Sequence, residues 1–179
     1  YDCLTQGKGG LMSISGEPEE ADSQTGGPVK VGVAVTDIFT GLYAANAIQG
    51  ALLERQKSGV GQHIDLALLD VQAAVLANQA TNYLVGDMIP QRLGNAHPNI
   101  VPYQAFPTAD SHIIITIGND QQFARFCEVL GEPELANDER YSTNSARVTN
   151  RTVLCNKISD FLKGQTSAYW LKCLERNHI

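Results

Sequence analysis

The sequence has few basic residues and no long hydrophobic run, and these two absences exclude two classes of partner. Its 13 Lys and Arg residues are outnumbered by 19 Asp and Glu residues, which gives a formal net charge of -6 at pH 7. No basic run with interleaved aromatic residues is present, so a nucleic-acid surface is not expected. No apolar run approaches the roughly 20 residues that a helix needs to cross a bilayer. We therefore expect a soluble protein without a membrane partner.

Cysteine is also scarce, and its spacing argues against two kinds of site. The four cysteines have no CxxC spacing, and the four histidines do not cluster with them. A metal site and a disulfide framework are therefore both disfavoured. Cys127, Cys155 and Cys173 lie in helical patterns beside apolar neighbours. We expect reduced, buried thiols of a cytoplasmic protein, with no metal.

One long amphipathic stretch, residues 33–59, dominates what the sequence does contain. Val33–Val35 is predicted to end a short strand, and Thr36 or Asp37 to cap a helix that Gly59 ends by adopting a positive φ. Apolar residues recur in this stretch at steps of three and four: Leu42, Ala45, Ile48, Leu52 and Leu53. The pattern predicts a core helix with a solvated C-terminal end.

Asp37 is the candidate reactive carboxylate of this stretch. A carboxylate in the first turn of a helix meets unpaired amide groups and the positive end of the helix dipole. Capping is nevertheless the ordinary role of an aspartate at such a position. The residues alone leave both roles open.

The segment after the long helix predicts a second strand and a second helix. His63–Leu69 alternates and then becomes continuously apolar, which is typical of a strand that enters a buried sheet. Asp70 can cap a helix from Val71 to about Val85. Strand, helix, strand and helix form a βαβ arrangement with a parallel sheet and a right-handed crossover. The predicted fold class is α/β, with residues 1–85 as part of a large Rossmann-like domain.

The rest of the chain predicts a linker and a small α+β domain. Residues 86–101 contain proline and glycine without periodicity and are predicted to form the linker. The small domain is predicted over residues 102–179. Its expected elements are a hairpin of residues 103–106 and 112–117, a helix from Asn119 or Asp120 to Leu130 that Gly131 ends, and helices over 145–163 and 167–177.

Several short strings, taken in order, give the chain a resemblance to a known family. They are Tyr1-Asp2, Gln6, Gly9-Gly10-Leu11-Met12, Gly16, Val35-Thr36-Asp37 with Thr40-Gly41, Lys57-Ser58-Gly59-Val60-Gly61-Gln62, Val101-Pro102-Tyr103-Gln104-Ala105-Phe106, Gly118-Asn119-Asp120 with Gln122-Phe123, and Tyr141-Ser142-Thr143-Asn144 with Arg147 and Asn150-Arg151. The set resembles the family III CoA-transferases, the CaiB/BaiF-like group of formyl-CoA, crotonobetaine and bile-acid CoA-transferases. It is most similar to the branch that uses dicarboxylic acyl-CoA donors such as succinyl-CoA. Since members of this family are much longer, the resemblance implies a central fragment.

The resemblance implies an enzyme that moves CoA from an acyl-CoA donor to a small carboxylic acid, with CoA as substrate and no metal. Asp37 matches the nucleophile, which forms a mixed anhydride and then a thioester with CoA. Tyr1, Asp2 and Leu68 match positions near bound CoA, and Gln6 is a candidate to offer its amide to the acyl oxygen. The family also implies an interlocked homodimer.

Each of these residues has a plainer alternative role. Tyr1 can be a partly buried aromatic with a bonded hydroxyl, Asp2 can cap the first turn, and Leu68 can be strand core. Arg92 and Arg147 are further candidates, since an arginine can bind the far carboxylate of a dicarboxylic acyl group through a charge-assisted fork.

Two other functions stay open. One is an α-methylacyl-CoA racemase of the same superfamily, in which a histidine occupies the position that matches Tyr1. A tyrosine is poorly matched to proton exchange near neutral pH, which favours the transferase. The other is an inactive fragment that serves only as a folding or dimerisation module, because the family builds much of its CoA pocket from an N-terminal portion.

Overall fold

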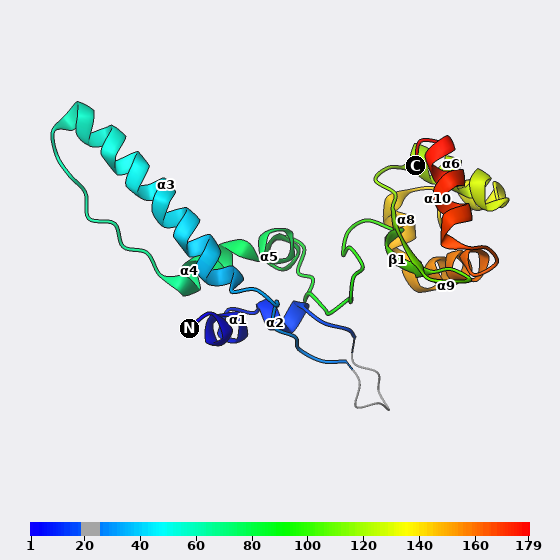
Figure 1. The fold of residues 1–179 in the computed structure, drawn as a ribbon, viewed down its shortest axis with the longest axis horizontal. Coiled ribbons are helices and arrows are strands. Elements are labelled where there is room, and N and C mark those ends of the chain that lie inside the picture. The colour runs from blue at the N-terminus through cyan, green and yellow to red at the C-terminus, as the bar shows by residue number, and fades with distance from the viewer. Residues whose placement is uncertain (19–25) are drawn as a thin grey trace. The chain divides into compact units, whose positions relative to one another are not determined.

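The computed structural model describes residues 1–18 and 26–179, and it divides the chain into two compact units, Tyr1–Gly94 and Asn95–Ile179. Helices dominate both units, and the second also contains a two-stranded antiparallel sheet (Figure 1). The predicted mixed α/β class is therefore confirmed in this coarse form, whereas the described residues form no parallel sheet. No helix in the described part of the chain is long and apolar enough to cross a membrane.

The first unit is a helical assembly with a small, mostly polar interior. Its described helices are α1 (Asp2–Lys8), α2 (Leu11–Ile14), α3 (Val35–Ser58), α4 (Leu68–Val75) and α5 (Ala77–Leu84). Helices α1, α3 and α4 contact one another in pairs. Val71 is the one buried apolar side chain longer than alanine among the described residues of this unit, and its other buried side chains are polar.

The start of α3 differs from the prediction. Val35 is the first residue of the helix, so the predicted strand end at Val33–Val35 is wrong. The capping position is occupied by Ala34, which has no side-chain acceptor, so the prediction that Thr36 or Asp37 caps the helix is also wrong. Thr36 and Asp37 instead lie within the first turn of α3, and the backbone amide of Thr36 donates to an acceptor on α1.

The length and the end of α3 agree with the prediction, but its environment does not. Gly59 follows the last turn with φ 73°, the positive value that was predicted. The apolar stripe is not in a core, because Leu42, Ile48, Leu52 and Leu53 are each 44% to 62% exposed. Nothing in the described residues covers this stripe, so α3 is not a core helix within this chain.

The second predicted strand is absent. Residues 60–67 leave the end of α3 and return to α4 as an extended segment that joins no sheet (Figure 1). A parallel strand needs a neighbour that accepts and donates its hydrogen bonds, and the described residues supply none here. The predicted strand over His63–Leu69 is therefore wrong for this structure. The helix expected from Val71 to Val85 begins earlier and is split into α4 and α5 at Leu76, the residue before Ala77, whose φ is 48°.

The second unit follows the local predictions closely, except that the single helix predicted over 145–163 is two helices, one on each side of Asn150. Its described elements are β1 (Tyr103–Pro107), β2 (His112–Thr116), α6 (Asp120–Leu130), α7 (Glu134–Asn137), α8 (Asn144–Thr149), α9 (Arg151–Leu162) and α10 (Ser167–Arg176). The hairpin is confirmed as antiparallel, with Phe106 opposite Ile113. Asn119 caps α6 by accepting the Gln122 amide at 2.9 Å, and Gly131 ends it with φ 81°.

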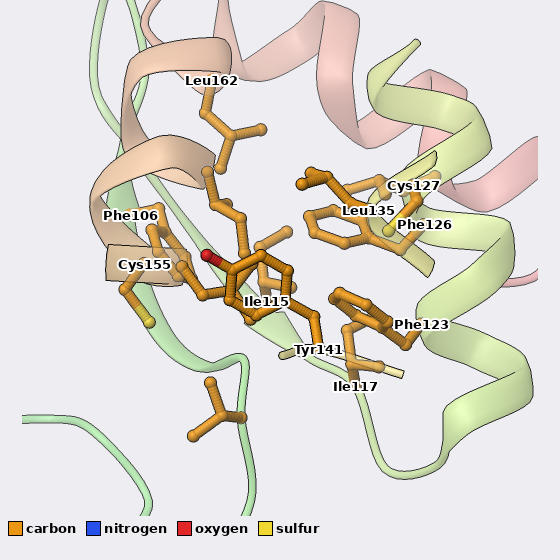
Figure 2. Close-up of a cluster of buried hydrophobic side chains, with 14 of the residues drawn as sticks. Phe106, Ile115, Ile117, Phe123, Phe126, Cys127, Leu135, Tyr141, Cys155 and Leu162 are labelled. Atoms are coloured by element: carbon orange, nitrogen blue, oxygen red, sulfur yellow. The ribbon is translucent and has the colours of Figure 1, made fainter. Parts of the chain in front are cut away.

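One apolar core holds the second unit together. Side chains from the hairpin, α6, α7 and α9 meet in it, and Figure 2 shows Phe106, Phe123, Phe126 and Leu162 converging on the same space. Each of these four side chains is at most 1% exposed. Burial of apolar surface therefore stabilises this unit from within the chain.

A buried arginine lies against this core. The Arg147 side chain is 0% exposed, and its guanidinium lies 4.3 Å from the centre of the Phe123 ring. Its Nε donates to the Val101 carbonyl at 2.7 Å, Nη1 to the Tyr141 carbonyl at 2.9 Å, and Nη2 to Asp120 at 2.7 Å. All three nitrogens are thus bonded to protein. The hypothesis that Arg147 binds a substrate carboxylate is wrong for this structure.

Replacing Arg147 with methionine should strongly destabilise the second unit. The change leaves two carbonyl groups without donors in a dry interior, and we expect the free energy of unfolding to fall by about 2–5 kcal/mol. The single tryptophan, Trp170, is 6% exposed, so its fluorescence during denaturant unfolding reports on this unit. Arg140→Met is the control, since the Arg140 side chain is 58% exposed and should matter much less. Equal effects of the two changes would contradict the structural role of Arg147.

The cysteines should react in an order set by burial. All four are free, with Cys3 exposed, Cys173 half-buried, and Cys127 and Cys155 buried. Burial raises the pKa of the Cys127 thiol to about 12 and that of Cys155 to about 11. Both thiols therefore stay protonated at about pH 8, where an unhindered cysteine begins to ionise. Alkylation followed by peptide mass spectrometry should label Cys3 in the native chain and Cys127 and Cys155 only after denaturation; native labelling of Cys127 as fast as Cys3 would contradict this.

Candidate active site

The predicted site residues lie in or directly before three helices, α1, α3 and α4, that pack together in the first unit. Four buried polar side chains join these helices: Asp2 and Gln6 of α1, Thr36 of α3 and Gln72 of α4. We call this set the polar cluster. Asp2 and Gln6 are one turn apart on α1, so they share one face of that helix.

Asp2 supplies the acceptor that the start of α3 lacks. Its Oδ1 accepts the backbone amide of Thr36 at 3.0 Å, across 34 positions of sequence. Thr36 is the second residue of α3, so this amide is one of the first-turn donors without a partner inside the helix. A carboxylate at this end also interacts favourably with the helix dipole. Asp2 therefore caps α3 from a different helix, and only 8% of it is exposed.

Gln6 holds the second oxygen of Asp2. The Gln6 Nε2 group donates to Asp2 Oδ2 at 2.8 Å, and the Gln6 Oε1 atom accepts the Val31 amide at 3.0 Å. Lys30 adds a weak ion pair, with its Nζ 4.0 Å from Asp2 Oδ2. Gln6 is 0% exposed, so both ends of its amide are engaged inside the protein.

Thr36 is also held through its side chain. Its hydroxyl donates to Gln72 Oε1 at 2.5 Å, and both side chains are 0% exposed. The Gln72 Nε2 group is buried without a partner among the described residues. Gly9, at the end of α1, packs so closely on Gln72 that an added Cβ would overlap its side chain. Helices α1 and α4 are therefore in close contact at this point.

Each of the other predicted residues lies next to a member of the polar cluster. Asp37 follows Thr36 in the first turn of α3 and is exposed. Tyr1 precedes Asp2 and is 97% exposed. Leu68 begins α4, one turn before Gln72, and is half-buried. One member of the cluster, Thr36, is thus the immediate sequence neighbour of the exposed carboxylate that the sequence singled out.

Two functional candidates escaped the sequence analysis. The hydroxyl of Thr36 and the amide of Gln72 bond to each other, and neither was predicted to do so. The signal for Gln72 is a single glutamine within the otherwise apolar run Val71–Leu76, since a polar side chain in such a run needs a buried partner. Elsewhere, Arg92 lines an open, mainly apolar pocket with Ile14, Leu76 and Tyr83. Among the residues that the structure describes, no three His, Cys, Asp or Glu side chains gather as a metal site.

Comparison with known proteins gives concordant results. The family model described as CoA-transferase family III matches residues 1–179. The succinate–glutarate CoA-transferase of Agrobacterium fabrum is 56% identical over 89% of this chain and 38% of its own length. The human succinyl-CoA:glutarate CoA-transferase is 44% identical over 100% of this chain and 40% of its own length. The chain thus spans about two fifths of these relatives.

A solved structure agrees with these matches. A crystal structure of a CAIB/BAIF family protein from Brucella suis is 49% identical and superimposes with a TM-score of 0.71. The match covers 99% of this chain and 45% of that one. The similarity therefore extends over both units of the chain but over less than half of its structural relative.

Gly9→Ala should loosen the contact between α1 and α4. The new methyl group would overlap the side chain of Gln72 and lie 2.9 Å from the Thr5 carbonyl oxygen, so the helices must move apart. We expect the free energy of unfolding to fall by about 1–3 kcal/mol. Gly50→Ala is the matched control, because Gly50 lies within α3 with open space around it. That change should instead stabilise the helix by about 0.5–1 kcal/mol.

The measurement is thermal unfolding followed by circular dichroism, with hydrogen exchange to locate the change in α1 and α4. A Gly9→Ala chain as stable as the Gly50→Ala chain would show that the two helices do not pack as described.

Proposed function

This chain belongs to CoA-transferase family III, and on that premise we propose that the protein containing it transfers CoA from succinyl-CoA to a small dicarboxylic acid. The observation that carries the proposal is the 56% identity to a relative named as a succinate–glutarate CoA-transferase. The human relative, named as a succinyl-CoA:glutarate CoA-transferase, supports the same substrate class. Glutarate is therefore the acceptor to test first.

Asp37 is the nucleophile in this proposal. Its carboxylate attacks the thioester carbonyl of the donor, which gives a mixed anhydride and CoA thiolate. The thiolate attacks the aspartyl carbonyl of the anhydride, which releases the donor acid and leaves CoA as a thioester on Asp37. The acceptor carboxylate attacks this thioester and expels CoA thiolate, which gives an anhydride between Asp37 and the acceptor. The thiolate finally attacks the acceptor's carbonyl in this anhydride and releases the Asp37 carboxylate. The products are the acceptor's CoA thioester and a free Asp37 carboxylate, and no step needs a metal.

The position of Asp37 supports this role. The residue is exposed in the first turn of α3, so an acyl-CoA can reach it. The positive end of the helix dipole favours the oxyanions that form at each addition. Tyr1 and Leu68 are proposed to contact CoA, and their exposure is compatible with that. Contacts of CoA with Asp2 and of the acyl oxygen with Gln6 gain no support from the geometry, since both side chains are buried and bonded within the protein.

The two units are proposed to be parts of a larger enzyme. Residues 1–85 would belong to a large α/β domain whose parallel sheet takes up the extended segment 60–67, with residues 86–101 as the linker and 102–179 as a small domain. The exposed apolar stripe of α3 supports this, because such a surface is normally covered in a finished fold. We further propose a cytoplasmic homodimer, as the family resemblance implies.

Intact-protein mass spectrometry after incubation with succinyl-CoA tests the proposal. The full-length protein that contains these residues should gain the mass of CoA less water, and hydroxylamine should remove it. Asp37→Ala should abolish the adduct, whereas Asp65→Ala, a change at an exposed aspartate outside the site, should retain it. Added glutarate should discharge the adduct as glutaryl-CoA.

Other outcomes would redirect the assignment. Exchange of the α-hydrogens of an acyl-CoA with deuterated water, without any adduct, would favour the racemase and overturn the transferase. An adduct that survives Asp37→Ala would show that another residue is the nucleophile. Running the 179-residue chain in parallel shows whether these residues retain a complete site or act only as a folding or dimerisation module.

A further inference from the structure

We propose that Asp2 and Gln6 are positioning residues that hold the first turn of α3, and with it Asp37, in the orientation that the reaction needs. This inference rests on the proposed role of Asp37 as nucleophile. It assigns Asp2 and Gln6 a role different from direct contact with CoA or the acyl group. Asp2 acts on α3 through its hydrogen bond with the backbone amide of Thr36, the residue immediately before Asp37.

The start of α3 has little else to fix it. The residue at its capping position, Ala34, offers no side-chain acceptor. Thr36 is the one buried residue of the whole helix, which extends over 24 residues. Apolar packing therefore contributes little to the placement of this turn. Among the described residues, two hydrogen bonds of Thr36 tie this turn to the other helices, from the amide to Asp2 and from the hydroxyl to Gln72.

The hydrogen bonds around Asp2 have a fixed direction. The Val31 amide donates to Gln6 Oε1, so the Gln6 NH2 group must face Asp2, and it donates to Asp2 Oδ2. The Thr36 amide donates to Oδ1 from the other side. Both oxygens of Asp2 therefore act as acceptors. An asparagine at this position can present one acceptor only, because its other terminal atom is an NH2 donor.

Because these hydrogen bonds have a fixed direction, a pair of substitutions can distinguish a positioning role of Asp2 from a direct role in the reaction. In Asp2→Asn the new NH2 group faces the NH2 group of Gln6, so one of these buried groups loses its partner. The second change Gln6→Glu restores each of these hydrogen bonds: the amide at position 2 accepts from Thr36 and donates to the new carboxylate at position 6, which still accepts from Val31. The two changes leave the shapes and the total charge of the pair unaltered. If Asp2 only positions α3, the double variant must recover activity.

The experiment measures the rate of CoA-adduct formation on Asp37 and the steady-state kcat and KM in the full-length protein. Asp2→Asn should lower the rate of adduct formation and kcat by roughly tenfold to a hundredfold, since a misplacement of about 1 Å is enough for such a loss. KM for succinyl-CoA should stay within about twofold of the wild-type value, because binding of CoA is not involved. Gln6→Glu alone should also lose activity, because it puts two carboxylates side by side.

The double variant Asp2→Asn/Gln6→Glu should recover to within about threefold of the wild-type kcat, a non-additive result that independent sites do not give. Asp70→Asn is the matched control. Asp70 is also an aspartate in the first helical turn, that of α4, but it is exposed, so its change should leave kcat unaltered. If Asp2→Asn fails to fold, the double variant still decides: an active double variant supports the positioning role, and a folded but inactive one overturns it.

Failure of this inference can be told apart from failure of the proposed function. If the wild-type protein forms no adduct on Asp37, the proposed function fails and the role of Asp2 falls with it. If the wild type forms the adduct and Asp2→Asn forms it equally fast, only the positioning role is overturned. A raised KM for succinyl-CoA that the second change does not rescue would instead mean that the Asp2 carboxylate contacts CoA.

Discussion

The hydrogen bond from the Thr36 amide to the Asp2 carboxylate is the constraint on which the first unit depends. It joins the first turns of two helices that lie 34 positions apart in the sequence. Val71 is the one fully buried apolar side chain longer than alanine among the described residues of this unit, so directional polar bonds contribute strongly to how α1, α3 and α4 meet. Buried hydrogen bonds add modestly to stability but cost much when one partner is missing, and for that reason they select one arrangement over its neighbours.

The two units are therefore stabilised by different means. The second has an apolar core, with the buried guanidinium of Arg147 bonded at all three nitrogens beside it. The first unit buries polar side chains and leaves the apolar stripe of α3 exposed. The candidate nucleophile thus lies in the unit with less internal packing. Its surroundings are set by a few bonds of fixed direction, which suits a site that must place one carboxylate accurately.

The sequence predicted those features that depend on neighbouring residues. The hairpin around residues 107–112, the Asn119 cap, the positive φ of Gly59 and the end of a helix at Gly131 all follow from short-range rules, and all are confirmed. The strands expected at Val33–Val35 and His63–Leu69 are absent, because a strand exists only beside a partner and the pattern of one segment does not supply it. The candidate site divides in the same way. Asp37 became a candidate from its place at a helix start and from the family resemblance, whereas the bonds of its neighbour Thr36 to Asp2 and Gln72 join distant segments that no local pattern records.

The length of α3 has a mechanical consequence for the site. A helix of 24 residues is about 36 Å long at about 1.5 Å per residue. The bonds of Thr36 hold one end of the helix, next to Asp37, and the rest of the helix moves with that end as a stiff rod. A tilt of about 5° at the first turn displaces the far end near Gly59 by about 3 Å, and a load on that far end acts on the first turn with the same leverage. A surface that packs on the distant end of α3 would therefore share control of the angle at which the Asp37 carboxylate lies.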